Sequence, residues 1–111
     1  MLNSNYKSFS DEALITQVKD GDDGAFNEIA NRYRDKLLNY INGYMNEPSI
    51  SENLVQDTLL KVYVNASKYK EIALFSTWIY TIARNCALTE YRKIKRRKTF
   101  SFSQLSSDEN E

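Results

Sequence analysis

The sequence predicts an all-α domain of four helices, and three observations lead to this fold class. Apolar residues recur three and four positions apart in four separate stretches, as on the buried face of an α-helix. Residues 1–98 contain no alternating apolar and polar run of the kind that predicts a strand. The chain has 111 residues, of which 41% are hydrophobic and 27% charged, which fits one compact domain with one core.

The first helix is expected from residue 10, after a flexible, mostly polar lead-in of residues 1–9. Ser10 is a suitable N-cap, and Asp11 and Glu12 place acidic groups in the first turn, where they stabilise the helix dipole. Gly21 can end this helix after about ten residues.

The second helix is expected to begin at a cap supplied by Asp22 or Asp23 and to run for about five turns to Met45. Residues 46–51 are predicted to form a turn, marked by Pro48.

The third helix is predicted to begin with Ser51 as its N-cap. Its core positions are spaced four and three apart: Val55, Leu59, Val62, Ala66 and Tyr69. Leu54 and Leu60 are apolar residues in addition to those that one buried stripe of the helix needs. Either a partner surface or a wide core face would explain them.

A loop is expected at residues 69–74, followed by a last helix over residues 75–98 that contains neither Gly nor Pro. Residues 84–98 carry seven basic side chains and one acidic one, although the formal net charge of the whole chain is zero. Residues 99–111 include four serines and three acids without a helical period, and a flexible tail is predicted there.

The composition argues against an enzyme and against a metal or cofactor site. The chain has no His, which removes the commonest general base and zinc ligand. Its only Cys, Cys86, is expected on the buried face of the last helix, and a single Cys excludes an internal disulfide and fits a reducing cytoplasm. Asp22 and Asp23 are read as capping residues. No apolar run is long enough for membrane insertion.

Basic residues stand beside aromatic, Asn and Thr side chains in the last helix. This combination can hold a phosphate backbone and contact bases, so nucleic-acid binding is one interpretation. A core helix with a solvated basic end is the other.

Three phrases of the sequence together resemble one protein family. They are GDDGAFNEIANRY at 21–33, SENLVQDTLLKVY at 51–63 and FSTWIYTIARNCALTEYRKIKRR at 75–97. In this order they are similar to the second conserved region of the extracytoplasmic-function (ECF) sigma factors of bacterial RNA polymerase. The resemblance covers about residues 10–98 and implies a helical sigma region-two domain.

The resemblance implies that the third helix docks on the β′ clamp helices of core RNA polymerase. The residues implied in this contact are Asn53, Leu54, Gln56, Asp57 and Leu60. At Asn53 the family usually has Asp, so one charge is missing from the contact.

The resemblance also implies that the 69–74 loop and the last helix melt the minus-ten promoter element and capture a base of the non-template strand. The residues implied in DNA binding are Tyr69, Lys70, Trp78, Thr81, Arg84, Asn85, Arg92, Lys93 and Arg96. By its spacing Trp78 also fits the core. Glu71, Ile72 and Ala73 replace the Gly-Asp-Ser-like stretch of many members, which affects the base preference.

Members of this family carry a second domain that reads the minus-thirty-five element, so we expect this chain to be a shortened version of such a factor. The resemblance further implies an anti-sigma factor as regulator and action in the cytoplasm, and we expect a monomer. Two other functions remain open from the residues alone: a helical regulator that binds duplex DNA, and a protein-interaction domain that binds no DNA.

Overall fold

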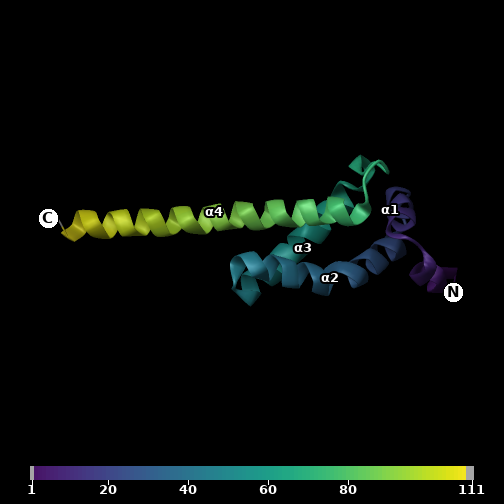
Figure 1. Cartoon of the computed structure of the whole chain (residues 1–111), viewed down its shortest axis with the longest axis horizontal. Helices are drawn as coiled ribbons and strands as arrows, with labels where there is room; N and C mark the ends of the chain where they lie inside the picture. The colour runs from purple at the N-terminus through teal and green to yellow at the C-terminus, as the bar shows by residue number, and fades with distance from the viewer. Residues whose placement is uncertain (1, 110–111) are drawn as a thin grey trace.

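The computed structural model describes the backbone of residues 2–109 and the side chains of residues 5–102. It confirms the all-α fold, since the described residues form helices and no strand. The elements along the chain are η1 (Leu2–Ser8), α1 (Asp11–Lys19), α2 (Asp23–Met45), α3 (Pro48–Val64), η2 (Ala66–Lys68) and α4 (Phe75–Glu109), where η denotes a short 3₁₀ segment (Figure 1).

The first two helices begin at the predicted caps. The Ser10 side chain accepts a hydrogen bond from the backbone N–H of Ala13, and the Asp22 side chain accepts one from the N–H of Ala25. Between the two helices, Gly21 has a φ of 95°, a left-handed conformation that other residues rarely adopt. Local sequence therefore determines the corner that joins α1 to α2.

The predicted start of the third helix is wrong. The helix begins at Pro48, and Glu47 is the N-cap, with its side chain accepting a hydrogen bond from the N–H of Ser49. Proline is tolerated in the first turn of a helix, because the N–H that it lacks would have no intrahelical partner there. Ser51 is fully buried instead, and its hydroxyl donates to Oδ1 of Asn42 on α2 at 2.9 Å.

Two further expectations differ from the structure at the ends of the chain. Residues 2–8 form η1, and the Tyr6 hydroxyl reaches the Asp22 carboxylate. The last helix does not stop at residue 98 but continues to Glu109, since nothing between Phe75 and that residue breaks a helix. Met1, Asn110 and Glu111, which the two predicted flexible segments include, lie outside the described residues.

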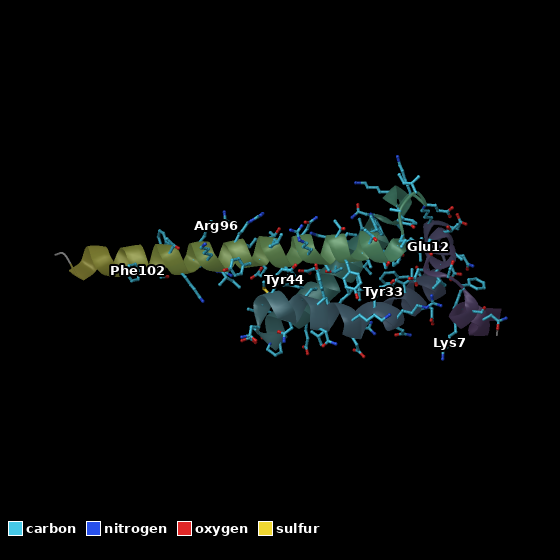
Figure 2. All side chains as sticks on the ribbon, viewed as in Figure 1. Lys7, Glu12, Tyr33, Tyr44, Arg96 and Phe102 are labelled. Atoms are coloured by element: carbon cyan, nitrogen blue, oxygen red, sulfur yellow. The ribbon has the colours of Figure 1, made fainter. Side chains whose placement is uncertain are left out.

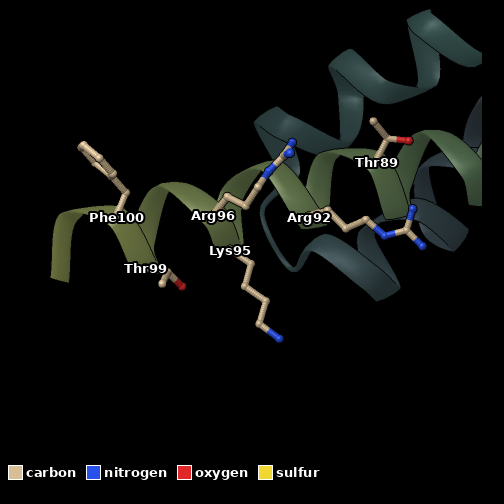
Figure 3. A pocket seen from close by; sticks show the side chains of 6 residues that line it. All are labelled: Thr89, Arg92, Lys95, Arg96, Thr99 and Phe100. Atoms are coloured by element: carbon tan, nitrogen blue, oxygen red, sulfur yellow. The ribbon is translucent and has the colours of Figure 1, made fainter. Parts of the chain in front are cut away.

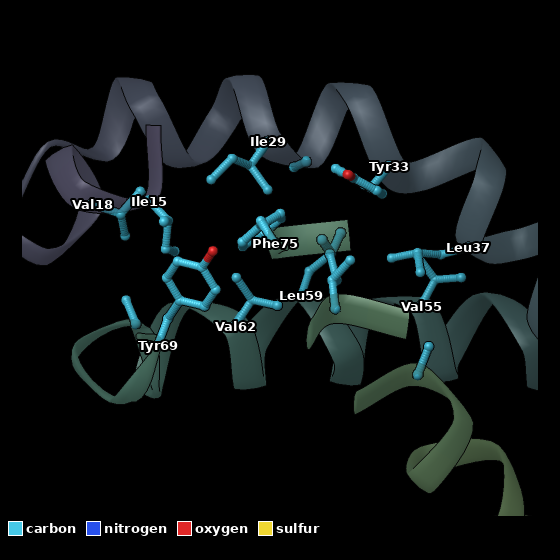
Figure 4. Packing of buried hydrophobic residues seen from close by; sticks show 14 of the residues in the cluster. Ile15, Val18, Ile29, Tyr33, Leu37, Val55, Leu59, Val62, Tyr69 and Phe75 are labelled. Atoms are coloured by element: carbon cyan, nitrogen blue, oxygen red, sulfur yellow. The ribbon is translucent and has the colours of Figure 1, made fainter. Parts of the chain in front are cut away.

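The core lies where α2, α3 and α4 meet, with α1 closing one end. Phe75 at the start of α4 is fully buried among side chains of α1, α2 and α3 and the η2 segment (Figure 4). Its ring lies edge-on to Tyr33 and to Tyr69, with centroids 5.7 and 5.8 Å apart respectively. Cys86 lies on the buried face of α4, as predicted.

The second half of α4 extends well beyond this core. The 35-residue helix is about 52 Å long by its rise per residue. It accounts for the elongated outline of 70 × 24 × 20 Å, and Figure 1 shows it projecting past the ends of α2 and α3. The body is thus compact, and most of the basic side chains of residues 84–98, from Arg92 to Lys98, lie on the half of α4 that projects from it. None of the described helices combines the length and the apolar character that crossing a membrane requires.

Candidate functional site

The exposed face of α3 carries most of the residues implied in polymerase binding. Asn53, Gln56 and Asp57 are exposed, and the Leu60 side chain is 60% exposed. Leu54 is not part of this surface, because it is 6% exposed and belongs to the core. The reason is that α3 packs against both α2 and α4 and so buries a wide face. The two leucines, which the sequence could not separate, therefore have different environments.

A groove of about 520 Å³ runs between α2 and α3 beside this face. Its lining residues are Asp23, Phe26, Asn27, Ala30, Arg34, Gln56, Leu59, Leu60 and Tyr63. Gln56 and Arg34 also line an adjacent hollow of about 320 Å³. The two helices thus form one concave surface with an apolar floor, an amide and a guanidinium.

Tyr63 is held in place at one end of this groove. Its hydroxyl donates to Oδ1 of Asp23 at 3.0 Å, and its ring lies edge-on to Phe26 at 5.0 Å. The hydrogen bond to the Asp23 carboxylate raises the pKa of the phenol. The sequence reasoning missed the α2 side of this surface. In the sequence, only the polar face of α2 indicates that this helix contributes to the surface, and such a face is equally typical of residues that merely contact solvent.

Tyr69 is not available to a base, contrary to what the resemblance implies. It is 2% exposed, and its ring packs against Phe75 and Trp78. Its hydroxyl donates to the carbonyl of Ala73, which closes the 69–74 loop on itself. Burial, and then the charges of Glu12 and Glu71, raise the pKa of this phenol. Tyr69 is thus a buried residue that supports the conformation of the loop.

Two side chains of α1 anchor the loop at its ends. The Lys19 ammonium donates to the carbonyl of Tyr69 at 2.7 Å and lies 5.6 Å from the centre of its ring. Oε2 of Glu12 accepts the N–H of Phe75 at 2.8 Å, which caps α4 from another helix. These contacts fix both ends of the loop relative to α1.

Between these anchors the loop presents exposed side chains. Lys70, which was implied in DNA binding, is exposed, and so is Glu71. Ile72 is 93% exposed and Leu74 67% exposed, and the sequence reasoning assigned neither to a site. The sequence signal for them is two apolar residues in a predicted loop, where an apolar side chain has no helical face on which to be buried.

Trp78 lies at the edge of the core. It is partly buried, and its ring centroid is 5.3 Å from that of Tyr69 and 5.8 Å from that of Phe75. Packing is therefore its main role in the structure, and only the exposed part of the indole can meet a ligand.

The remaining residues implied in DNA binding are exposed along α4. Thr81, Arg84, Asn85 and Arg92 follow one another at helical spacing on the side away from the core. Arg96 is exposed on the projecting half (Figure 2).

Lys93 is also exposed but points in another direction. It comes about five turns after Phe75, so it lies on the stripe that is buried earlier in α4. Only the projection of α4 beyond the body keeps this lysine in solvent.

A hollow of about 820 Å³ lies along the projecting part of α4. It is lined by Thr89, Arg92, Lys95, Arg96, Thr99 and Phe100 (Figure 3). All six side chains belong to one helix, so the hollow is the space between them and not a cleft between elements. Three of its lining side chains are cations, Arg92, Lys95 and Arg96, which lie within little more than one helical turn and can contact phosphates. Arg97 is partly neutralised, because its guanidinium lies 3.4 Å from Oε2 of Glu90.

Comparison with known proteins identifies the family. Residues 29–97, which span most of α2, all of α3 and the basic segment of α4, match sigma-70 region 2. The chain belongs to the sigma-70 region 2 family.

Similar proteins are ECF sigma factors, which confirms the resemblance drawn from the three phrases. The ECF RNA polymerase sigma factor SigW of Bacillus subtilis is 35% identical over 81 residues, which make up 73% of this chain and 43% of that protein. The ECF RNA polymerase sigma-E factor of Haemophilus influenzae is 32% identical over 81 residues, 73% of this chain and 42% of the relative. This sigma region 2 chain thus spans less than half the length of the curated relatives it matches.

A solved structure shares the fold. The NMR structure of an engineered region 2 of sigmaE in complex with GTAAAA superposes with a TM-score of 0.75 at 30% sequence identity. The similarity covers 81% of this chain and 94% of that one. The sigma region-two fold predicted from the sequence is therefore confirmed.

Proposed function

We propose that this sigma region 2 chain binds core RNA polymerase through α3 and recognises and melts the promoter minus-ten element through the 69–74 loop and α4. The observation that carries the proposal is that two sets of exposed side chains lie on two different helices, α3 and α4, of one packed domain. Gln56, Asp57 and Leu60 lie exposed on α3, whereas Arg84, Asn85 and Arg92 lie exposed on α4. One chain can then hold a protein and a nucleic acid at the same time.

The chemistry of the α3 surface suits the clamp helices of the β′ subunit. The Gln56 amide offers a donor and an acceptor, and the Asp57 carboxylate can pair with a basic side chain. Leu60 adds apolar area that is 60% exposed in the free chain. Asn53 contributes a neutral amide at the edge of the contact.

The chemistry of the loop and α4 suits a single strand. Lys70, Arg92, Lys93 and Arg96 can hold phosphates, and the Asn85 amide can hydrogen-bond a base edge. Binding to unpaired bases offsets the cost of unpairing and unstacking them, so melting needs no covalent chemistry and no cofactor. The chain would act in the cytoplasm as a monomer, with an anti-sigma factor as its regulator.

The first test is binding of the chain to bacterial core RNA polymerase. Wild type is compared with the double variant Gln56→Ala, Asp57→Lys, and with a matched control, Asn39→Ala, Asp20→Lys, whose exposed positions lie on α2 and at the end of α1. We expect the first variant to lose binding and the control to retain it. Equal binding by all three would show that α3 is not the polymerase contact.

The second test separates the proposal from the two other functions. Binding to a labelled single strand of sequence GTAAAA, which the similar sigmaE structure holds, is compared with binding to the same sequence as a duplex. We expect preference for the single strand and affinity that falls with salt. Preference for the duplex would favour an ordinary DNA-binding regulator. Binding to neither, or binding without salt dependence, would favour a protein-interaction domain.

A further inference from the structure

The border between α2 and α4 carries tyrosines that neither proposed interface uses. Lys36, Tyr40 and Tyr44 are spaced four apart on α2, and Tyr80 and Arg84 are spaced four apart on α4. Residues four apart lie on one face of a helix, so each set forms a stripe. Figure 2 shows Tyr33 and Tyr44 along this border. We call Lys36, Tyr40, Tyr44, Tyr80 and Arg84, the five residues of the two stripes, the tyrosine platform.

The three tyrosine rings of the platform form a connected group. The Tyr40 ring is central, with its centroid 5.1 Å from that of Tyr80 and 5.4 Å from that of Tyr44. Both contacts are edge-to-face, at 78° and 77°. The hydroxyls of Tyr40 and Tyr44 lie 3.3 Å apart, within hydrogen-bond distance. The Tyr44 side chain is nevertheless 41% exposed, so aromatic surface remains open to solvent.

A cation stands at each end of the platform. Lys36 is exposed, and its ammonium lies 5.5 Å from the centre of the Tyr33 ring, at the end nearer α1. Arg84 is exposed at the other end, close enough to Tyr40 for its charge to oppose the rise in the pKa of that phenol. The rise itself comes from the hydrogen bond with Tyr44 and from burial. No acidic residue belongs to either stripe.

We infer that the tyrosine platform is a second subsite for single-stranded DNA, in which a base stacks on Tyr44 while Lys36 and Arg84 hold phosphates. Exposed rings between cations are the combination by which proteins bind single strands without reading their sequence. Arg84 connects this platform with the exposed face of α4. It lies about one turn from Thr81 on that face, and its charge acts on Tyr40 of the platform. A strand that is bound along α4 can thus continue over the border to α2.

The inference rests on the proposed function. The test uses strands of two lengths, so that failure of the inference can be distinguished from failure of the proposed function. Binding is measured by fluorescence anisotropy with fluorescein-labelled strands of about six and about twelve nucleotides, lengths within the range of single-strand binding sites. The variant is Lys36→Gln, Tyr44→Leu, which removes one ring and one charge and retains an apolar side chain. The matched control is Lys61→Gln, Tyr63→Leu on α3, where Tyr63 is 45% exposed.

We expect wild type and control to bind the longer strand more tightly than the shorter one. The platform variant should bind the shorter strand as wild type does but lose about fivefold to about 150-fold on the longer one, as expected for the loss of a base stack of roughly 1–3 kcal/mol. An unchanged affinity for the longer strand would overturn the inference and leave the proposed function standing. Failure of wild type to bind either strand would overturn both.

Discussion

The carboxylate of Glu12 on α1 caps α4, because its Oε2 accepts the backbone N–H of Phe75 at 2.8 Å. The two residues are 63 positions apart in the chain. An acidic group at the N-terminus of a helix also interacts favourably with the helix dipole. The start of α4, and with it the end of the 69–74 loop, is therefore fixed by tertiary structure and not by a neighbouring residue.

Replacing Glu12 should loosen this arrangement. We expect Glu12→Ala to lower the free energy of unfolding by roughly 0.5–2 kcal/mol, the usual cost of losing a cap. Urea denaturation measures the change. Asp35→Ala, at an exposed acid of α2, serves as the control and should stay within about 0.5 kcal/mol of wild type. A Glu12 variant as stable as this control would show that the cap is dispensable.

Leu54 and Leu60 should behave in opposite ways although both were implied in one interface. Leu54→Ala leaves a cavity in the core and is expected to cost about 2–5 kcal/mol of stability. Leu60→Ala should change stability by less than about 0.5 kcal/mol and weaken binding to core polymerase. Thermal unfolding and a polymerase pull-down on the same two proteins check both halves. Similar unfolding temperatures for the two variants would contradict the assignment.

Tyr69 and Lys70 form a second pair of neighbours with different expected effects. Because the Tyr69 ring is enclosed by the core, Tyr69→Ala should cost about 3–5 kcal/mol. Lys70→Ala should leave stability unchanged and weaken single-strand binding, since the lysine is exposed on the loop. Denaturation and anisotropy measurements test the pair. Wild-type stability of Tyr69→Ala would mean that the ring is free to stack on a base after all.

The link between Tyr6 and Asp22 should make stability depend on pH. The Tyr6 hydroxyl donates to the Asp22 carboxylate, with 2.6 Å to Oδ2. This bond, opposed by partial burial and aided by the N–H groups of Ala25 and Gly24, lowers the pKa of Asp22 in the folded chain. The carboxylate therefore stabilises the fold above its unfolded pKa of about 3.9, and the contribution is lost as the pH falls through the lowered value.

The variant Tyr6→Phe removes the main cause of that shift. We expect wild type to be more stable than Tyr6→Phe near neutral pH, and the difference to shrink as the pH falls below about 4. Urea midpoints at several pH values for both proteins give the comparison. A difference that stays constant over this range would show that Tyr6 acts through packing alone.

The salt dependence of DNA binding should separate two arginines of α4. Arg92 lines the basic hollow, whereas Arg97 is paired with Glu90. We expect Arg92→Gln to reduce the slope of log affinity against log salt by about 0.7, the value for one phosphate contact on a single strand. Arg97→Gln should reduce it less. Anisotropy titrations over a range of salt concentrations measure both slopes, and equal reductions would contradict a specific contact at Arg92.

Local patterns in the sequence were sufficient for much of this fold. The spacing of apolar residues and the caps at Ser10 and Asp22 predicted α1 and α2. The start of α3 could not be read in the same way, because proline is compatible both with a turn and with a first helical turn. Contacts such as Tyr6 with Asp22 join segments 16 positions apart, and no local pattern reports them.

The candidate site was predicted by residue type but not by environment. The resemblance pointed to Tyr69 and Leu54, yet both are buried, because α3 and the loop after it pack on more than one neighbour. Conversely, Ile72 and Tyr44 are exposed apolar or aromatic residues, which the spacing alone could not distinguish from core positions.

The projecting α4 also sets a fixed distance on the molecule. About five helical turns, or about 27 Å, separate Trp78 in the first turn of α4 from Arg96 on the projecting half. This length corresponds to about eight base steps along a B-form strand. As one uninterrupted helix joins the two ends, α4 holds the exposed guanidinium of Arg96 at a fixed distance from the 69–74 loop.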